Sequence, residues 1–139
     1  IPGDEAGGGA ARADEEYWRA TARAARQRWR DATRDVEERQ TRVAELRNAF
    51  YAADDPAYRD GVIKLDWDAA LSSLAGAKDE VEAARDDLQR LLDVGRRAGA
   101  QPGWLREGLE LEPQPEERPS EPTTMEPVEP RFVDEERRP

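Results

Sequence analysis

Apolar residues recur at heptad spacing along two long stretches of this chain, and this repeat most limits what the chain can fold into. Steps of alternating three and four residues keep apolar side chains on one face of an α-helix, where a partner helix can cover them. Nine of the ten positions in the first stretch are apolar, as are all eight in the second. The positions are Trp18, Ala22, Ala25, Trp29, Ala32, Val36, Arg39, Val43, Leu46 and Phe50, then Trp67, Ala70, Leu74, Ala77, Val81, Ala84, Leu88 and Leu91. The pattern predicts two helices packed along one apolar seam.

The segment 54–65 separates the two stretches and contains a proline and a glycine, so we expect the second helix to fold back against the first. In the register that places Phe50 on Trp67, large and small apolar residues tend to share a layer of the seam. Arg39 then falls opposite Ala77, whose small side chain leaves room for the arginine stem to lie along the seam. The predicted fold class is therefore all-α, an antiparallel two-helix coiled-coil hairpin.

The distribution of charge favours the same pairing. Residues 19–47 carry nine Arg and five acidic residues, whereas residues 66–94 carry eight acidic and three basic residues. Arg28 lies near Asp87 in this register and is the best ion pair expected between the helices. Each exposed pair contributes only about 0.2–1 kcal/mol, so charge selects the orientation while apolar burial stabilises the fold.

Composition divides the chain into three parts. Residues 1–12 are rich in Gly and Ala and are expected to form a flexible leader. Residues 109–139 are rich in Pro and acidic residues and are expected to form a disordered tail. Between them, residues 13–108 form the hairpin, with helix 1 at about 14–53, the turn at 54–65, helix 2 at about 66–98 and a return segment at 99–108.

Several classes of chemistry are excluded by composition. The charged content of 39% and the mean hydropathy of −1.01 suit a thin helical hairpin better than a multilayer core. The chain has no Cys and no His, which removes thiol nucleophiles, imidazole bases and most zinc sites. Paired carboxylates such as Asp54 and Asp55 need a closed cleft for acid–base chemistry, and no phosphate-binding loop motif occurs. We therefore predict a protein that is not an enzyme and holds no metal or cofactor.

The net charge of −10 argues against nucleic acid as a partner, because affinity for nucleic acid comes mainly from neutralising phosphates. One Arg-rich face of helix 1 is the exception, and it is expected to be solvated and to face the acidic second helix. No apolar run approaches the roughly 20 residues of a membrane-spanning helix. The expected partner is therefore another protein or a second copy of the chain. The residues of the Arg-rich face are Arg19, Arg23, Arg26, Arg30 and Arg34.

Candidate partner-binding residues gather first at the turn and along the flank of the seam. Tyr51, Tyr58 and Ile63 form an aromatic and aliphatic cluster there, which either caps the seam or forms a binding tip. Leu71 and Leu92 widen the apolar stripe of the second helix, so they would suit a second hairpin packed alongside, as in a four-helix bundle.

Two further candidates lie beyond the second helix. Trp104 and its neighbour Leu105 are expected to fold over the open end of the hairpin as a lid, or to form a docking site if left exposed. Phe132 is one of the few apolar residues of the tail.

Four short segments resemble an uncharacterised group of exported bacterial coiled-coil hairpin proteins. They read EYWR at 16–19, LRNAFY at 46–51, DDPAYRDG at 54–61 and PGWLR at 102–106. The resemblance covers roughly residues 14–108 and implies a helical hairpin and export, with no known activity. The chain also begins at Ile1 with a Gly-rich lead, in keeping with removal of a signal peptide. The expected location is the periplasm or cell envelope, with the cytoplasm as the alternative.

Two classes of function follow from these observations. The first is a non-catalytic structural or protein-interaction protein of the bacterial cell envelope, acting as a coiled-coil spacer or as an accessory subunit of a larger complex. The second is a cytosolic adaptor or chaperone-like hairpin that binds client protein at its tip.

Overall fold

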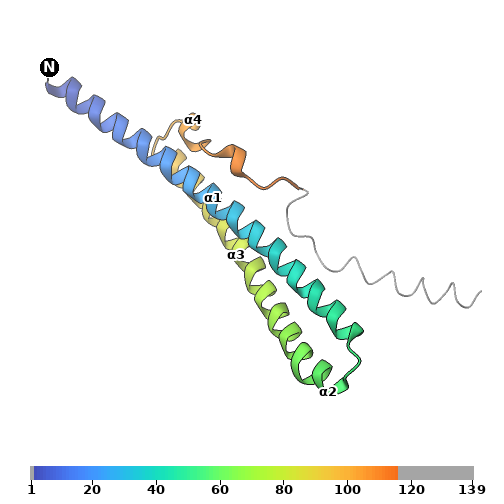
Figure 1. The fold of residues 1–139 in the computed structure, drawn as a ribbon. Helices are drawn as coiled ribbons and strands as arrows, with labels where there is room; N and C mark the ends of the chain where they lie inside the picture. The colour runs from blue at the N-terminus through green and yellow to red at the C-terminus, as the bar shows by residue number, and fades with distance from the viewer. Residues whose placement is uncertain (1, 116–139) are drawn as a thin grey trace, which may run out of the picture.

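The structure, a computed structural model, describes residues 2–115 as two long helices with shorter helical segments around them. The long helices are α1 (Pro2–Ala52) and α3 (Lys64–Arg97). The short segments are α2 (Pro56–Tyr58), the π-helical turn η1 (Arg59–Ile63), α4 (Pro102–Leu105) and the 3₁₀ turn η2 (Leu109–Leu111). In Figure 1, α1 and α3 lie side by side and run in opposite directions, with α2 at their shared end.

The prediction of an all-α protein is confirmed, and the part of the chain that the structure describes contains no strand. The two-helix description is not confirmed, because a third helix, α4, packs against both α1 and α3. The chain direction reverses again at α4, so that the segment after it runs along α1 on the side away from α3 (Figure 1).

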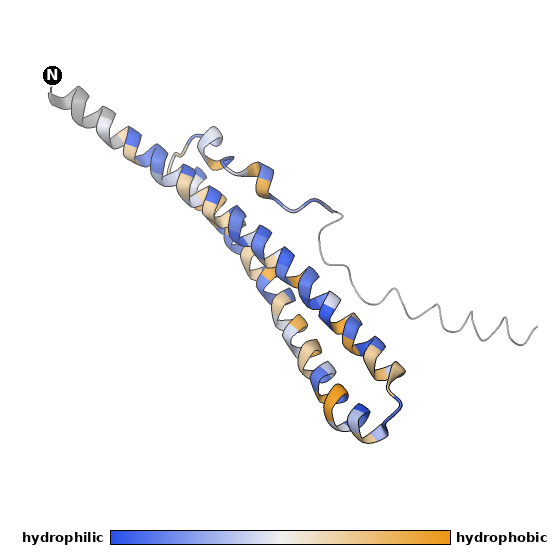
Figure 2. Cartoon of the chain, viewed as in Figure 1, coloured by the Kyte–Doolittle hydropathy of each residue, from blue (hydrophilic) through white to orange (hydrophobic). Residues whose placement is uncertain are grey.

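The core is a single row of apolar side chains between α1 and α3. Val36 is fully buried, and the ring centroids of Phe50 and Trp67 lie 5.4 Å apart, as the sequence register predicted. Figure 2 shows much of α1 as hydrophilic, which agrees with a helix that buries only one stripe. The buried cluster consists of Trp29, Ala32, Val36, Ala77, Val81, Ala84 and Leu88.

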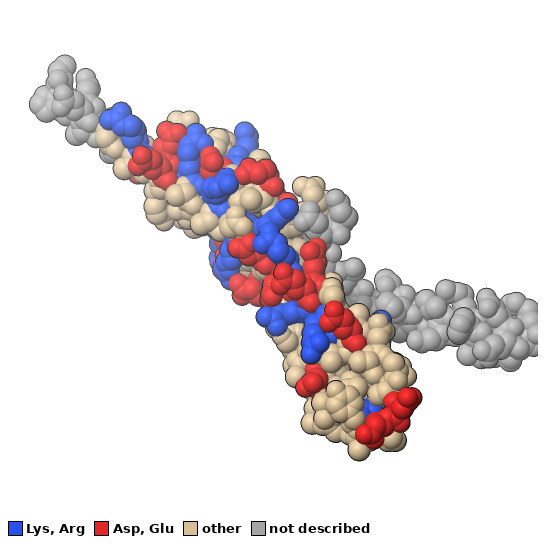
Figure 3. Space-filling view, in the orientation of Figure 1, with Lys and Arg blue, Asp and Glu red and all other residues tan. Residues whose placement is uncertain are grey.

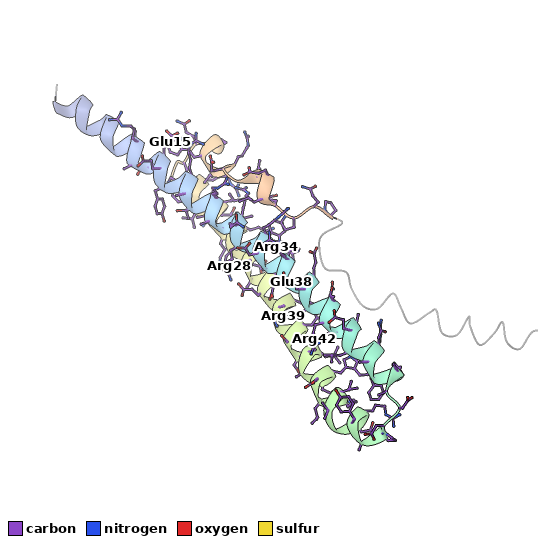
Figure 4. All side chains as sticks on the ribbon, viewed as in Figure 1. Glu15, Arg28, Arg34, Glu38, Arg39 and Arg42 are labelled. Atoms are coloured by element: carbon purple, nitrogen blue, oxygen red, sulfur yellow. The ribbon has the colours of Figure 1, made fainter. Side chains whose placement is uncertain are left out.

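Polar contacts between the helices flank this row. Arg28 donates hydrogen bonds to Asp87 and, at 2.9 Å, to Glu80, which confirms the expected Arg28–Asp87 pair. Arg39 bonds to Asp35 at 2.9 Å and to the Ser73 hydroxyl, so its guanidinium reaches the surface while its stem lies at the seam. Figure 4 shows Arg28 and Arg39 along the line where α1 and α3 meet.

The turn is shorter than the predicted segment 54–65. Only residues 53–55 are non-helical, and the helix resumes at Pro56 instead of near Asp66. Asp55 is the N-cap and accepts a hydrogen bond from the Ala57 amide at 3.0 Å. Pro at the first helical position needs no hydrogen-bond partner and has the required φ, which explains the early start. Gly61 lies within η1 and has no positive φ.

The flexible leader predicted for residues 1–12 is also corrected, because α1 begins at Pro2. Proline at the first helical position favours a helix start there, because its missing N–H needs no partner and its φ is already helical. An existing helix extends by one hydrogen bond per residue, so the glycines at 7–9 lower helix stability without stopping propagation. Figure 1 shows the first turns of α1 projecting beyond the end of α3.

The predicted boundary of the tail at residue 109 is too early. Residues 109–115 are described, Leu109–Leu111 form η2, and Pro113 is fully buried. The rest of the predicted tail, residues 116–139 with Phe132, lies outside the described residues.

Leu88→Ala is expected to lower the free energy of unfolding by about 2–5 kcal/mol, because it leaves a cavity in the apolar row between the two long helices. Leu88 is 3% exposed, whereas Leu65 on the same helix is 63% exposed and provides a matched control. Urea denaturation followed by circular dichroism measures both variants. Equal losses for Leu88→Ala and Leu65→Ala would contradict the assigned core.

Candidate protein-interaction surface

The chain after α3 closes one end of the helical pair, which we call the base. α3 ends at Arg97, and Gly99 has a φ of +90°, as expected for the residue after a helix C-cap. Leu105 is 4% exposed and lies against Gly95, where an added Cβ would come within 2.7 Å of a Leu105 methyl group. The lid predicted from Trp104 and Leu105 is thus present, with Leu105 covering the helices and Trp104 half-buried.

Arg26 anchors this lid from the middle of α1. Its side chain is 3% exposed and donates hydrogen bonds to the carbonyl oxygens of Leu105, at 2.7 Å, and Glu107, at 3.0 Å. Its Nε atom bonds to the Glu112 carboxylate at 2.6 Å. A buried guanidinium needs hydrogen-bond acceptors, and here the return segment, which extends in the structure to Pro113, supplies them to Nε and Nη1.

Two exposed ion pairs extend the same contact along α1. Arg19 bonds to Glu107 at 3.0 Å and to Glu15 at 2.8 Å, and Arg23 bonds to Glu110 at 2.8 Å. These hydrogen bonds raise the pKa of Arg19, mainly through Glu15 and then Glu107. This part of the Arg-rich face therefore binds the return segment, instead of being solvated or facing α3.

Gly108 allows the return segment to lie this close to α1. Its φ of +87° is in the left-handed region, and an added Cβ would lie 3.1 Å from the Arg23 Cα atom. The next turn holds Glu110, whose pKa lies below its ordinary value because its own backbone amide, and then Arg23, hydrogen-bond the carboxylate. The close approach at Gly108 and the Arg23–Glu110 bond hold the acidic residues after α4 against the arginines of α1.

The opposite end of the helical pair is the tip (residues 50–71), where apolar side chains are exposed instead of covered. Five of the eight exposed large hydrophobic residues of the described chain belong to it. Figure 3 shows mixed charges along the shaft and a largely uncharged surface toward the tip, with acidic residues at its end. The exposed tip residues are Tyr51 at 74%, Leu65 at 63%, Tyr58 at 54%, Leu71 at 44% and Val62 at 43%.

Aromatic packing fixes one side of the tip. Tyr51 makes edge contacts with Phe50 and Trp67, with ring centroids 5.2 and 6.1 Å apart. The guanidinium of Arg59 lies over the Phe50 ring at 5.6 Å from its centroid. Tyr51 is therefore held in place while most of its surface stays in water, which lowers the entropy lost when a partner covers it.

The tip also has a groove where α1, α2 and the start of α3 meet. Its apolar floor includes Leu46 and Ile63, which are 7% and 6% exposed. Tyr58 forms part of its wall, and acidic side chains lie at its rim. The tip groove is lined by Arg42, Leu46, Ala49, Ala52, Ala53, Asp54, Asp55, Tyr58, Ile63 and Asp66.

The candidate residues named from the sequence divide between the two ends. Tyr51, Tyr58 and Leu71 are exposed at the tip, and Ile63 is buried in the floor of the tip groove. Leu92 and Trp104 are half-buried at the base. Leu92 packs against the core cluster and shares a hollow with Leu105 and Pro102, so it is not a free flank residue.

Sequence reasoning missed the contacts of Arg26. The signal was present in the spacing, because acidic residues at 107, 110 and 112 follow the arginines at 19, 23 and 26 in order. The rim of the tip groove was also missed, because the turn was expected to extend over residues 54–65.

Among the described residues, no three acidic side chains converge in a way that could hold a metal ion. Within the same part of the chain, no helix combines the length and apolar character that crossing a membrane requires. Comparisons with protein-family models, with curated proteins and with solved structures gave no match. The arrangement itself is suited to binding at the tip, where apolar groups are exposed, and to closure at the base.

Arg26→Ala is expected to lower the free energy of unfolding by about 1.5–3 kcal/mol, because it removes charge-assisted hydrogen bonds to Glu112 and to two carbonyl oxygens. Arg34→Ala, at an exposed position paired with Asp31, serves as the control and should cost less than about 1 kcal/mol. Hydrogen exchange should show faster exchange of the amides of residues 104–112 in the first variant only. Unchanged protection in Arg26→Ala would contradict the anchoring role.

Glu110 is expected to give a pH-dependent contribution to stability. Its folded pKa is lower than its ordinary value of 4.5, so the contribution is present above the unfolded pKa and is lost as the pH falls through the folded pKa. The difference in unfolding midpoint between the native chain and Glu110→Gln should thus be largest near neutral pH and vanish in acid. In NMR titrations, Arg23→Gln should raise the pKa only in part, because the backbone amide remains. A Glu110 carboxyl that titrates at or above 4.5 in the native chain would contradict this account.

Proposed function

We propose that this chain is a non-catalytic protein-interaction protein, a coiled-coil spacer that presents its tip to a protein partner. The observation that carries the proposal is the gathering of exposed apolar residues at one end of a highly charged molecule. Isolated exposed hydrophobic residues are ordinary on protein surfaces, but their concentration at one end of a charged molecule favours an interaction site there. Tyr51, Tyr58 and Leu65 are the central residues of this surface.

The spacer in this proposal is an antiparallel two-helix coiled-coil hairpin with a closing segment at its base. The heptad row from Trp29 to Val36 on α1 packs against that from Ala77 to Leu88 on α3, which supports the coiled-coil geometry. A helix of 34 residues has a length of about 50 Å, so the tip and the base are far apart. Such a molecule separates a binding end from an attachment end.

We place this role in the bacterial cell envelope, on the strength of the resemblance of four sequence segments to exported hairpin proteins. A second candidate is a cytosolic adaptor or chaperone-like hairpin, which the exposed tip favours equally. Fractionation of cells of the source organism, with the protein detected by an antibody, discriminates between them. A self-associating bundle has weaker support, because Leu92, one of the two residues that suggested it, is partly covered at the base.

A photo-reactive amino acid introduced at Tyr58 or Leu65 is expected to crosslink one discrete protein in cells of the source organism. Both side chains are exposed at the tip, at 54% and 63%, so the substitution should not disturb the core. The same group at Asp79, an exposed position on the shaft, is the control. Mass spectrometry identifies the adducts.

The proposal requires that the adduct forms from the tip and not from the shaft. Adducts from Asp79 with none from Tyr58 or Leu65 would refute the assignment of the tip. Equal adducts from all three positions would indicate non-specific capture and would refute it as well.

A further inference from the structure

The acidic residues of the tip are only partly neutralised. Between residues 51 and 71 the chain has five Asp and two basic residues. Both basic residues are already paired, Arg59 with Asp60 at 3.1 Å and Lys64 with Asp68 at 2.9 Å. Within residues 2–115, the three remaining carboxylates have no cationic partner. They belong to Asp54, Asp55 and Asp66.

These same three carboxylates line the tip groove. The groove has one basic residue, Arg42, and its guanidinium lies 3.7 Å from the Glu45 carboxylate on the same helix. The floor is apolar, with Leu46 and Ile63 buried beneath it. The groove is therefore a shallow, open depression with an apolar floor and more acidic than basic residues in its lining.

This combination determines the chemistry of an occupant. An apolar side chain gains from burial on the floor, and a cation beside it gains from carboxylates that have no cationic partner within the described chain. Nucleic acid, phosphate and acidic peptides are repelled by the same rim. A second copy of the chain is disfavoured, because two molecules of net charge −10 repel each other.

We propose that the tip groove binds a segment of a partner protein in which a Leu or aromatic side chain is flanked by Lys or Arg. This inference rests on the proposed function and adds the face of the tip that is used and the charge of the partner. The apolar anchor occupies the hollow above Ile63, and the basic residues lie against Asp54, Asp55 and Asp66. The charges orient the segment, while burial of the anchor supplies most of the affinity.

Three fluorescent peptides of equal length test the chemistry on the full chain, which is unmodified in this assay. One alternates Leu with Lys, one alternates Leu with Glu, and one alternates Ser with Lys. Fluorescence anisotropy should show the Leu/Lys peptide binding about tenfold or more tightly than either of the others. Equal binding of the Leu/Lys and Leu/Glu peptides would overturn the inferred charge, and equal binding of the Ser/Lys peptide would overturn the apolar anchor.

The triple variant D54N/D55N/D66N locates the site. The D55N change retains a side-chain oxygen that can cap α2, so the fold should be preserved, and circular dichroism checks this. Affinity for the Leu/Lys peptide should fall about tenfold. The control E38Q/D79N/D86N makes the same change in charge at exposed shaft positions and should leave affinity nearly unchanged. Equal losses in both triple variants would show general charge attraction and overturn the site.

Three further outcomes also overturn the inference. If the labelled full chain binds unlabelled chain and the Leu/Lys peptide competes with that binding, the occupant is a second copy. If no peptide binds while the tip still crosslinks one protein in cells, the proposed function stands and the basic apolar segment is wrong. Loss of both the peptide binding and the tip crosslink would refute the proposed function itself.

Discussion

A single apolar row between α1 and α3 supports most of this structure. Two helices have only one interface to bury, so every core residue lies close to solvent at its edges, and the flanking positions must be polar. The high charge of the chain follows from this geometry. With so little interface available, large side chains are favoured. Trp29 and Trp67, which lie toward the two ends of the row, bury more area than an aliphatic residue could.

The chain covers one end of this row and leaves the other end exposed to solvent. At the base, the return segment covers Gly95 with Leu105 and is held by the buried guanidinium of Arg26. At the tip, the chain turns through only three non-helical residues and leaves Tyr51, Tyr58 and Leu65 in water. The chain thus closes one end with its own residues and leaves the other apolar end exposed, and this exposed end is the one that the proposed function assigns to a partner.

The periodic part of the fold could be predicted from the sequence, because heptad spacing fixes which residues face the partner helix. The Phe50–Trp67 layer and the Arg28–Asp87 pair followed from that register and are confirmed. The contacts of the return segment could not be predicted in the same way. Composition alone places Glu112 in a solvated tail. In the structure, residues 107–112 instead pack on α1 because three arginines of that helix pair with their carboxylates. At the tip, the exposed aromatics were anticipated, but the groove depends on Asp55 and Pro56 restarting the helix early.

The central claim is that one chain is complete at its base and offers its tip to a different protein. Light scattering of the full chain after size exclusion, over a range of concentrations, tests this most directly. The account predicts the mass of a single chain throughout. A stable dimer or tetramer that reverts to single chains when Tyr58 and Leu65 are replaced by Ser would contradict it, because the tip would then be occupied by a second copy.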